Sequence, residues 1–346
     1  MMLAKKIAYR AGALAMQHRW LNRDTLTIVM FHRILRPNSP EWSEADPTYR
    51  VSDTVFADCL AFFKKHYHPV RIEQVASALA GESRLPDHAL LVTFDDGWAD
   101  NLEIGLPLLR DTEMPAAVFV VAEAIEEQAD GPWWQETVFT ALRNGQLSGN
   151  RLATLFSRCG WDAPRDMPEI EAVFVFICRL QALSSAERGA ILAQLELPPR
   201  QRSRQMMTSK QVREMASAGI AIGTHGFTHV PLTLVEQPQA ELENAMRYLQ
   251  SLFGADYPSA RTLSFPHGRY NSAIVEMARN SGYRVQCSSD TNLNRMRAGR
   301  PVSDLLGRIS IVADAITDKR GRFQPELLAT WLFRRPIAPG AGYPKI

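Results

Sequence analysis

The sequence lacks paired cysteines, a strong net charge, internal repeats and low-complexity segments, and each absence narrows the classes of protein it can represent. Four cysteines occur, far apart and with no Cys-x-x-Cys pair, so neither a zinc knuckle nor a redox motif is indicated. The net charge of +2 gives no sign of a nucleic-acid partner or of a strongly acidic one. Residues 1–20 have no continuous apolar core, so we expect neither a signal peptide nor a bilayer span there.

Isolated cysteines fit a reducing compartment better than bridges between distant positions, although the sequence leaves both arrangements open. We therefore expect a cytoplasmic protein, with the inner face of the membrane as the alternative. That alternative comes from residues 1–20, which carry Lys5, Lys6, Arg10 and Arg19 among apolar residues. They form either a basic amphipathic helix on a membrane surface or a terminal helix packed on the domain.

The sequence does contain an alternation of apolar runs and amphipathic segments. Ala89–Phe94 is typical of a buried strand, Ser52–His66 of a helix capped by Ser52, and Leu306–Val312 of a last strand. With 346 residues, 46% of them hydrophobic, the chain can bury the core of one large domain. Strands that alternate with helices predict a parallel α/β sheet, and functional residues at strand ends favour a barrel.

The segment Thr93-Phe94-Asp95-Asp96-Gly97 ends one of these predicted strands. Two adjacent carboxylates at the end of a buried strand are costly unless something compensates their charge. A metal ion would do so, because it holds one carboxylate ionised and leaves the other free to move protons. Gly97 permits a sharp exit from the strand. The alternative is a solvated Asp-Asp-Gly turn, and the pentapeptide alone does not decide between them.

A second segment favours the metal. The run Gly219–Ile222 leads into Gly223-Thr224-His225-Gly226-Phe227-Thr228-His229. If the chain turns helical there, histidines four residues apart project from one face, where one ion can bind both. Asp96 would be the third protein ligand and would leave an open position for water. This ligand set suits a catalytic Zn²⁺ and also accepts Co²⁺ or Ni²⁺, whereas the alternative is two unrelated surface histidines.

Three segments together resemble the NodB-like polysaccharide deacetylases. They are Thr93–Gly97, His225–His229 and Ser264-Phe265-Pro266-His267-Gly268, which occur in the family's order, each after a strand-like run. The resemblance covers residues 25–315. It implies a deformed, incomplete (β/α) barrel of about seven strands. It also implies metal-assisted hydrolysis of an acetamide on an N-acetylated sugar, with bacterial exopolysaccharide among the expected substrates.

The resemblance also implies the roles of individual residues. Asp96, His225 and His229 would hold the metal, and Asp95 would take the proton from the attacking water. The metal would polarise the carbonyl and lower the pKa of the bound water toward ~7. An acid must then protonate the departing amine.

The sequence departs from the family pattern in its second and third motifs. Gly226 stands where the family commonly has Ser or Thr, so either Thr228 supplies the hydroxyl or the loop is held otherwise. Ser264 replaces an Arg that orients the base, and Arg261 and Arg269 are the nearby candidates for that role.

The end of the third motif and the last motif raise further questions. Pro266 and His267 are expected to contact the substrate, with a solvent-facing loop as the alternative for His267. The family's final Leu-x-His is absent: Leu306-Gly307-Arg308 stands in its place, and no His follows His267. The usual general acid is therefore missing from its usual place.

His32 is our candidate for the missing acid. It follows the run Leu26–Phe31, and Phe31-His32-Arg33-Ile34 resembles an N-terminal Tyr-His-Arg segment of some family members. An imidazole that titrates near pH 7 has a suitable pKa to protonate an amine. The alternative is a structural His bonded to a neighbouring loop.

Residues 126–205 break the alternation and are predicted to form a helical insertion in a barrel domain of residues 25–315. An N-terminal helix of residues 1–24 precedes this domain, and a C-terminal extension of residues 316–346 follows it. Trp133 and Trp134 lie near the start of the insertion. They either stack on sugar rings at the mouth of the site or anchor the insertion to the barrel.

Three functions follow from these motifs. The leading one is a metal-dependent hydrolase of carbon–nitrogen bonds other than peptide bonds, which removes N-acetyl groups from an amino-sugar polymer, oligosaccharide or glycolipid. The second removes formyl or another small acyl group from a lipid-linked sugar. The third is a sugar-binding protein without turnover, which the missing late His favours and the intact Asp95, Asp96, His225 and His229 oppose.

Overall fold

The strand β5 (Ala89–Phe94) lies in the interior of the sheet. All six of its residues are buried, and it pairs in parallel with β1 (Thr25–Phe31) on one side and β6 (Ala116–Val120) on the other. A continuous apolar run is the pattern of such a strand, because both faces of a parallel sheet are covered. The computed structural model describes residues 2–126, 133–147, 149–162, 169–195 and 205–338.

The parallel strands follow one another around a curled sheet, which confirms the predicted barrel. Their spatial order is β1, β5, β6, β7 (Ala221–Thr224), β8 (Thr262–Ser264), β9 (Val285–Cys287) and β12 (Leu305–Leu306). Short strands add to this path: β4 (His68–Pro69) pairs with β5, and antiparallel β10 (Asn294–Arg297) and β11 (Arg300–Pro301) extend the β1 edge. A separate parallel pair is formed by β2 (Arg33–Leu35) and β3 (Arg50–Ser52).

The last strand of the barrel is broken, so the prediction of one strand over Leu306–Val312 was wrong. β12 pairs with β9, whereas β13 (Ile309–Ser310) pairs with β1 at the opposite edge. Gly307 and Arg308 therefore span the gap between the two edges. Gly307 is required here, because an added Cβ would lie 2.5 Å from the side chain of Asn292.

Helices occupy most of the connections between the parallel strands, and their predicted caps are present. Ser52 Oγ accepts a hydrogen bond from Val55 N–H at 3.1 Å and starts α4, whose Phe56, Leu60 and Phe63 are fully buried. Among the helices of the described residues, none combines the length and the apolar character that a membrane span requires. The helices are α1 (Met2–Arg10), α2 (Ala13–Leu21), α3 (Pro40–Glu44), α4 (Asp53–His66), α5 (Ile72–Leu79), α6 (Leu106–Asp111), α7 (Ala122–Glu126), α8 (Trp134–Arg143), α9 (Gly149–Arg158), α10 (Glu169–Gln181), α11 (Ser185–Leu192), α12 (Ser209–Ser217), α13 (Pro238–Phe253), α14 (Ser272–Asn280), α15 (Ala313–Ile316) and α16 (Pro325–Phe333).

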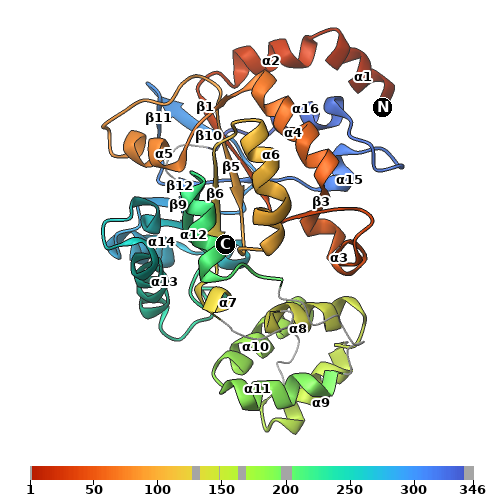
Figure 1. The fold of residues 1–346 in the computed structure, drawn as a ribbon, viewed down its shortest axis with the longest axis vertical. Coiled ribbons are helices and arrows are strands. Elements are labelled where there is room, and N and C mark those ends of the chain that lie inside the picture. The colour runs from red at the N-terminus through yellow and green to blue at the C-terminus, as the bar shows by residue number, and fades with distance from the viewer. Residues whose placement is uncertain (1, 127–132, 148, 163–168, 196–204, 339–346) are drawn as a thin grey trace.

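Helices α8 to α11 gather at one end of the barrel, and α1 and α2 lie at the other (Figure 1). The four helices enclose a hydrophobic core of their own, with Phe156 and Phe176 fully buried. That core continues into the barrel through Trp98, which follows β5, and Val230, which follows β7. The insertion is therefore packed on the ends of the strands that carry the predicted site.

Candidate metal and catalytic site

Asp95 and Asp96 lie where β5 turns away from the sheet. The backbone N–H of Asp95 still donates to the carbonyl of Phe31 on β1, at 3.1 Å. Asp96 and Gly97 then take left-handed conformations, with φ of 72° and 89°. This turn separates the two carboxylates, so that each meets different partners.

The two histidines lie on a loop, so the helical turn that would have placed them on one face is absent here. His225 follows β7 directly, and the chain then passes through left-handed conformations at Gly226 (φ 77°) and His229 (φ 65°). No helix is assigned to residues 225–229. The spacing of four residues still brings the two rings together, with 4.8 Å between their centroids.

Glu241 of α13 holds this loop in place of helical hydrogen bonds. Its Oε1 accepts from the backbone N–H groups of Phe227 at 2.8 Å and Thr228 at 2.7 Å, and from the Thr228 hydroxyl at 2.9 Å. Burial raises the pKa of Glu241, while these hydrogen bonds from the loop act to lower it. The hydroxyl that the loop uses is therefore that of Thr228, which binds Glu241. This answers the question raised by Gly226, which stands where the family commonly has Ser or Thr.

Asp96, His225 and His229 present three ligand atoms to one point. These atoms lie within 4.8 Å of one another, and Asp96 Oδ1 is 3.5 Å from His225 Nε2 and 3.4 Å from His229 Nε2. Ligand atoms about 2.0–2.1 Å from a tetrahedral Zn²⁺ stand roughly 3.3–3.4 Å apart. The distances from Asp96 therefore fit a four-coordinate divalent ion with one open position.

Neighbouring groups orient these ligands toward that point. His225 Nδ1 lies 2.8 Å from the carbonyl of Ser264, to which it donates, so its Nε2 carries the free lone pair. Trp98 Nε1–H donates to Asp96 Oδ2 at 2.9 Å, which leaves Oδ1 for the ion. On the His229 side, Gln135 Oε1 lies 3.4 Å from Nδ1, and the Gln135 amide nitrogen donates to the carbonyl of Thr228 at 2.6 Å.

The pKa of His229 is lowered well below its ordinary value. Burial is the main cause, and His267, His225 and His32 add to it. The imidazole is therefore neutral at physiological pH, which is the form that binds a metal.

Asp95 is held by Arg308 instead of by the ligand set. The two guanidinium nitrogens donate to Asp95 Oδ1 and Oδ2, both at 2.7 Å, and the Ser264 hydroxyl adds a bond to Oδ2 at 3.1 Å. Burial alone would raise the pKa of Asp95, but Arg308 and then His225 outweigh it, and the pKa is lowered. Asp95 is therefore an ionised carboxylate in a buried position.

The prediction that Arg261 or Arg269 orients Asp95 was wrong, because Arg308 makes that contact. Arg269 instead forms an ion pair with Glu171 of α10, and Arg261 lies at the opposite end of the strands. Arg308 stands where the family's Leu-x-His is expected, and it makes the contact with Asp95 that would be expected of an Arg at position 264. The Ser264 hydroxyl accepts a hydrogen bond from Arg308 at 2.7 Å. The Ser in the third motif and the Arg in the last motif, both of which depart from the family pattern, therefore contact each other.

The candidate site opens into a cavity of about 600 Å³ between the barrel and the insertion. Asp95, Asp96, His225 and His229 line it together with His32. This volume falls in the range of about 300–1,000 Å³ that is typical of small-molecule sites. The structure thus brings the predicted base, the predicted ligands and the predicted acid to one cavity.

The insertion contributes an aromatic wall to this cavity. Trp133, Phe139 and Phe174 line it, and the ring of Trp133 lies 5.0 Å from that of His229. Trp134 is instead part of the core of the insertion, where Arg188 stacks over its ring at 4.6 Å.

The two residues of the third motif also differ in position. His267 lines the cavity, packed between His229 at 4.2 Å and Phe174 at 4.7 Å between ring centroids. Burial lowers the pKa of His267 to about 3, and nearby His225 and Arg269 add to this. Pro266 is buried and does not line the cavity. It packs against Gly226, where a Cβ added to the glycine would lie 3.0 Å from Pro266 Cγ.

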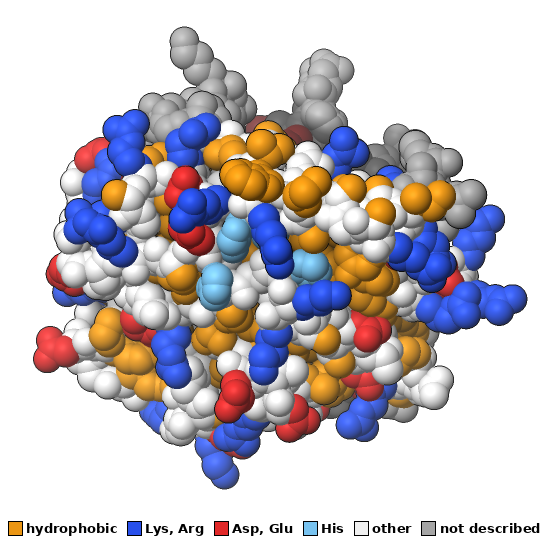
Figure 2. Space-filling view, turned by 90° about the horizontal axis from the view of Figure 1, so that it is seen from above, with side chains coloured by type: hydrophobic (Ala, Val, Ile, Leu, Met, Phe, Trp, Pro, Cys, Tyr) orange, Lys and Arg blue, Asp and Glu red, His pale blue; other side chains and the backbone are white. Residues whose placement is uncertain are grey.

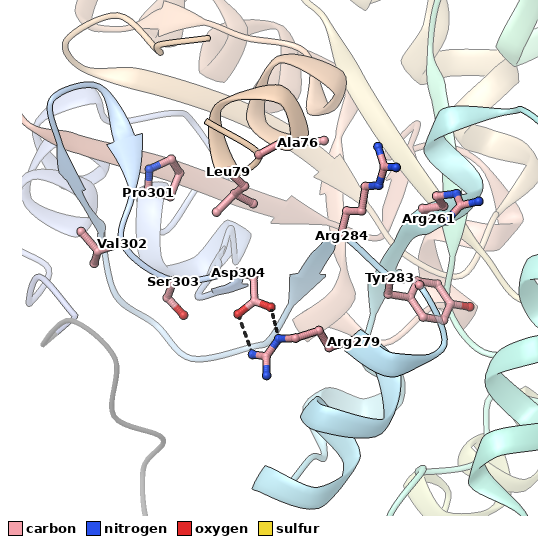
Figure 3. Close-up of a pocket in the computed structure, with 12 residues that line it drawn as sticks. Ala76, Leu79, Arg261, Arg279, Tyr283, Arg284, Pro301, Val302, Ser303 and Asp304 are labelled. Carbon is pink, nitrogen blue, oxygen red and sulfur yellow. Dashed lines mark hydrogen bonds and ion pairs between the residues drawn. The ribbon is translucent and has the colours of Figure 1, made fainter. Parts of the chain in front are cut away.

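A second cavity, of about 530 Å³, lies at the amino ends of β9 and β12 (Figure 3). Arg261, Arg279 and Arg284 line it, and Arg279 donates to both carboxylate oxygens of Asp304, at 2.8 and 3.0 Å. None of the motif carboxylates or histidines lies there. The predicted catalytic residues and metal ligands therefore lie in the cavity at the carboxyl ends of the strands.

Comparison with known proteins agrees with this geometry. Residues 82–163 and 169–286 match the model of the polysaccharide deacetylase family. The chain belongs to this family, and the family predicted from the three motifs is confirmed. YxkH of Bacillus subtilis (strain 168), which is provisionally named a polysaccharide deacetylase, is 19% identical over 268 residues, covering 77% of this chain and 64% of YxkH. The chain thus spans less than two thirds of the length of this relative.

Solved structures share the fold. The deacetylase PplD from Streptococcus pyogenes, solved in complex with acetate, aligns with a TM-score of 0.57 and 17% identity, covering 90% of this chain and 99% of PplD. IcaB from Ammonifex degensii aligns with a TM-score of 0.54 and 17% identity, covering 90% of this chain and 97% of IcaB. These likenesses establish the deformed, incomplete (β/α) barrel.

Proposed function

We propose that this protein is a metal-dependent hydrolase that removes N-acetyl groups from an amino-sugar polysaccharide, oligosaccharide or glycolipid. One observation carries the proposal: the ionised carboxylate of Asp95 lies beside the three converging ligand atoms and lines the same cavity. Asp95 Oδ2 is 3.9 Å from His225 Nε2. A protein that only bound sugar would need no such base next to a metal.

Asp96, His225 and His229 would hold the ion, with Zn²⁺ as the first candidate and Co²⁺ or Ni²⁺ as alternatives. When bound there, such an ion supplies polarisation of the amide carbonyl and a water acidic enough to give its proton to a weak base.

Asp95 accepts that proton. Its two oxygens take three hydrogen bonds, two from Arg308 and one from Ser264. A carboxylate has about four lone-pair sites, so one remains for the proton of the attacking water. Arg308 fixes the direction of that lone pair, because a bidentate pair leaves the carboxylate no freedom to rotate.

His32 donates the proton that the leaving amine requires. It lies at the end of β1 on the wall of the cavity, where Asn101 Nδ2 donates to its carbonyl at 2.8 Å and its ring packs on Tyr49, with 4.7 Å between centroids. Burial lowers the pKa of His32, while the carboxylates of Asp96 and then Asp95 oppose that shift. The acid form of His32 therefore requires a lower pH than that of a free imidazole does.

The walls of the cavity support a sugar as the substrate. Sugar rings present apolar faces that stack on aromatic side chains. Trp133, Phe139 and Phe174 supply such rings within the same cavity as the base. The exposed hydroxyls and the acetamide would then face the polar side formed by the strand ends.

A single assay separates this function from its competitors. Metal content is measured on the purified protein, and acetate and formate release are measured on a panel of acylated amino sugars that includes free oligosaccharides and lipid-linked sugars. Acetate release that a chelator abolishes supports the proposal. Release of formate alone would identify a deformylase. Sugar binding with neither product would identify a binding protein and overturn the proposed hydrolysis.

A further inference from the structure

The first two helices expose a group of large apolar side chains, which we call the N-terminal face: Ile7, Met16, Trp20 and Leu21. Their exposed fractions are 59%, 61%, 80% and 62%. In the described part of the chain, two other large hydrophobic side chains are exposed, Tyr49 and Leu234, and both are less exposed than these four. Four of these six exposed side chains therefore lie on two helices that contact each other, with Met16 and Trp20 on one side of α2. Apolar side chains gathered on one part of a surface mark an interaction site, whereas isolated ones are ordinary.

Packing of α2 on the barrel does not require these side chains. The inner side of α2 carries Leu14 and His18, both buried, and the His18 ring stacks on Phe333 of α16 with 4.1 Å between centroids. Just beyond the helix, Asn22 Nδ2 donates to the carbonyl of Phe333 at 2.9 Å. Met16 and Trp20 have the same spacing of four residues, but the helical repeat places them on the opposite side. The helix is thus anchored by one side and presents the other outward.

The charge on this part of the chain is of one sign. Residues 1–23 contain five Lys or Arg residues and no Asp or Glu. Lys6, Arg10 and Arg19 are exposed, and Lys65 on the neighbouring α4 is exposed as well. The pKa of His66 is lowered to about 4, first by burial and then by the positive charges of Lys65 and Arg19, so these charges converge on one region. Viewed from this end, the surface shows hydrophobic side chains among Lys and Arg, together with scattered Asp and Glu side chains from other parts of the chain (Figure 2).

We propose that the N-terminal face binds the surface of an anionic phospholipid membrane. Apolar side chains on a helix that lies in the interface enter the boundary between headgroups and acyl chains, and neighbouring Lys and Arg side chains meet the lipid phosphates. Trp20 suits that boundary, because an indole is apolar with one polar N–H. A second copy of the chain is a poorer occupant, since a two-fold contact would bring the same positive charges together.

The position of α2 sets the orientation of the bound protein. The His18 ring lies 4.6 Å from the ring of His88, which directly precedes β5, so α2 covers the amino ends of the strands. The cavity with Asp95 and Asp96 lies at the carboxyl ends of the strands, and residues of α8 and α10 line it as well. These two helices lie at the end of the barrel far from α1 and α2 (Figure 1). A membrane-bound molecule would therefore open its cavity toward the aqueous side.

Co-sedimentation with vesicles tests the proposal. One set of vesicles contains phosphatidylcholine alone, and the other contains phosphatidylcholine and phosphatidylglycerol in equal parts. We expect binding to the second set that weakens with added salt, and little binding to the first. Each Lys or Arg near an anionic surface contributes on the order of a fivefold change in partitioning. The triple variant Lys6→Gln, Arg10→Gln, Arg19→Gln should therefore bind on the order of 100-fold more weakly.

The apolar part of the face is tested by the double variant Met16→Ser, Trp20→Ser, which should bind more weakly by on the order of tenfold or more. Both sets of variants change outward side chains, so their circular dichroism and urea unfolding should match the wild type. Two matched controls change exposed residues outside this face: Leu234→Ser changes an apolar residue, and the pair Lys210→Gln, Arg213→Gln changes basic residues of α12. The controls should bind as the wild type does.

Three results would overturn the proposal. The first is equal binding to both kinds of vesicle, and the second is binding to neither. The third is self-association in vesicle-free solution that the Met16→Ser, Trp20→Ser variant abolishes, because a second copy would then be what covers the face. None of these measurements depends on hydrolysis, so they test the surface independently of the proposed enzyme activity.

Discussion

Replacing Arg308 by Gln should destabilise the fold strongly. The guanidinium is fully buried, and it donates to both oxygens of Asp95 at 2.7 Å, to Ser264 Oγ at 2.7 Å and to the carbonyl of Ser288 at 3.0 Å. Removal of one partner of a buried ion pair costs about 3–5 kcal/mol, because the other charge stays buried without compensation. An exposed pair would lose only about 0.2–1 kcal/mol. We therefore expect the free energy of unfolding to fall by about 3–5 kcal/mol at neutral pH.

Urea unfolding of the metal-free protein measures this loss. The set comprises the wild type, Arg308→Gln, Asp95→Asn and the double variant. The double variant should lose less than the sum of the single losses, because neither charge then remains alone in the interior. Arg308→Lys keeps the charge but not the planar fork, so its loss should be intermediate. A loss below about 1 kcal/mol for Arg308→Gln, or strict additivity in the double variant, would refute the reasoning.

The pH dependence of stability gives a second readout of the same pair. In the wild type, burial acts to raise the pKa of Asp95, but Arg308 and His225 lower it below the ordinary value of 3.8. A lowered folded-state pKa adds stability above pH 3.8 that is lost as the pH falls toward the folded-state pKa. Without Arg308, burial should dominate and raise the folded-state pKa. The variant should then lose stability as the pH rises through that raised pKa. The slope of its free energy of unfolding against pH would thus have the opposite sign to that of the wild type.

The remaining predictions concern the division of roles in the site. His225→Ala and His229→Ala should each lose the bound metal and turnover; elemental analysis that finds full occupancy in both would exclude this ligand set. Asp95→Asn should keep the metal and lose turnover by about 10²–10⁴-fold, whereas Asp96→Asn should bind the metal more weakly, and equal metal loss in both would contradict the assignment. His32→Ala should fold, keep its metal and lose most amide hydrolysis while it hydrolyses an activated ester nearly as well, because that leaving group needs no proton; equal losses on both substrates would leave His267 as the next acid to test.

Local sequence was sufficient to locate the residues that we propose as metal ligands and base. Asp95 and Asp96 follow a six-residue apolar strand, and His225 follows another, so the parallel sheet necessarily delivers them to one edge. The start of α4 was equally predictable, because the cap formed by Ser52 acts within three residues along the chain. These features depend on neighbours in sequence or on strand direction, both of which the sequence encodes directly.

The conformation of the histidine loop could not be read in the same way. The spacing of His225 and His229 fits a helix, yet the tertiary structure offers the Glu241 carboxylate as an acceptor for the N–H groups of the loop. Glu241 comes from α13, beyond the loop. Because another element supplies this acceptor, the N–H groups of the loop do not need helical hydrogen bonds. The spacing of the two histidines does not indicate that such an acceptor exists.

The partner of Asp95 was decided only by the fold. Arg308 lies 213 residues away along the chain, at the break between β12 and β13. No local sequence pattern predicted this break. Arg261 and Arg269, which are close to the third motif in sequence, point to other groups. The sequence suggests arginines that are close to the motif along the chain. A buried carboxylate instead needs a cation that the fold brings within bidentate hydrogen-bonding distance, and for Asp95 that cation is Arg308. The sequence by itself therefore determined which groups we propose for the chemistry, because they follow strands whose ends meet at one edge of the sheet. The tertiary structure decided which groups hold them in place.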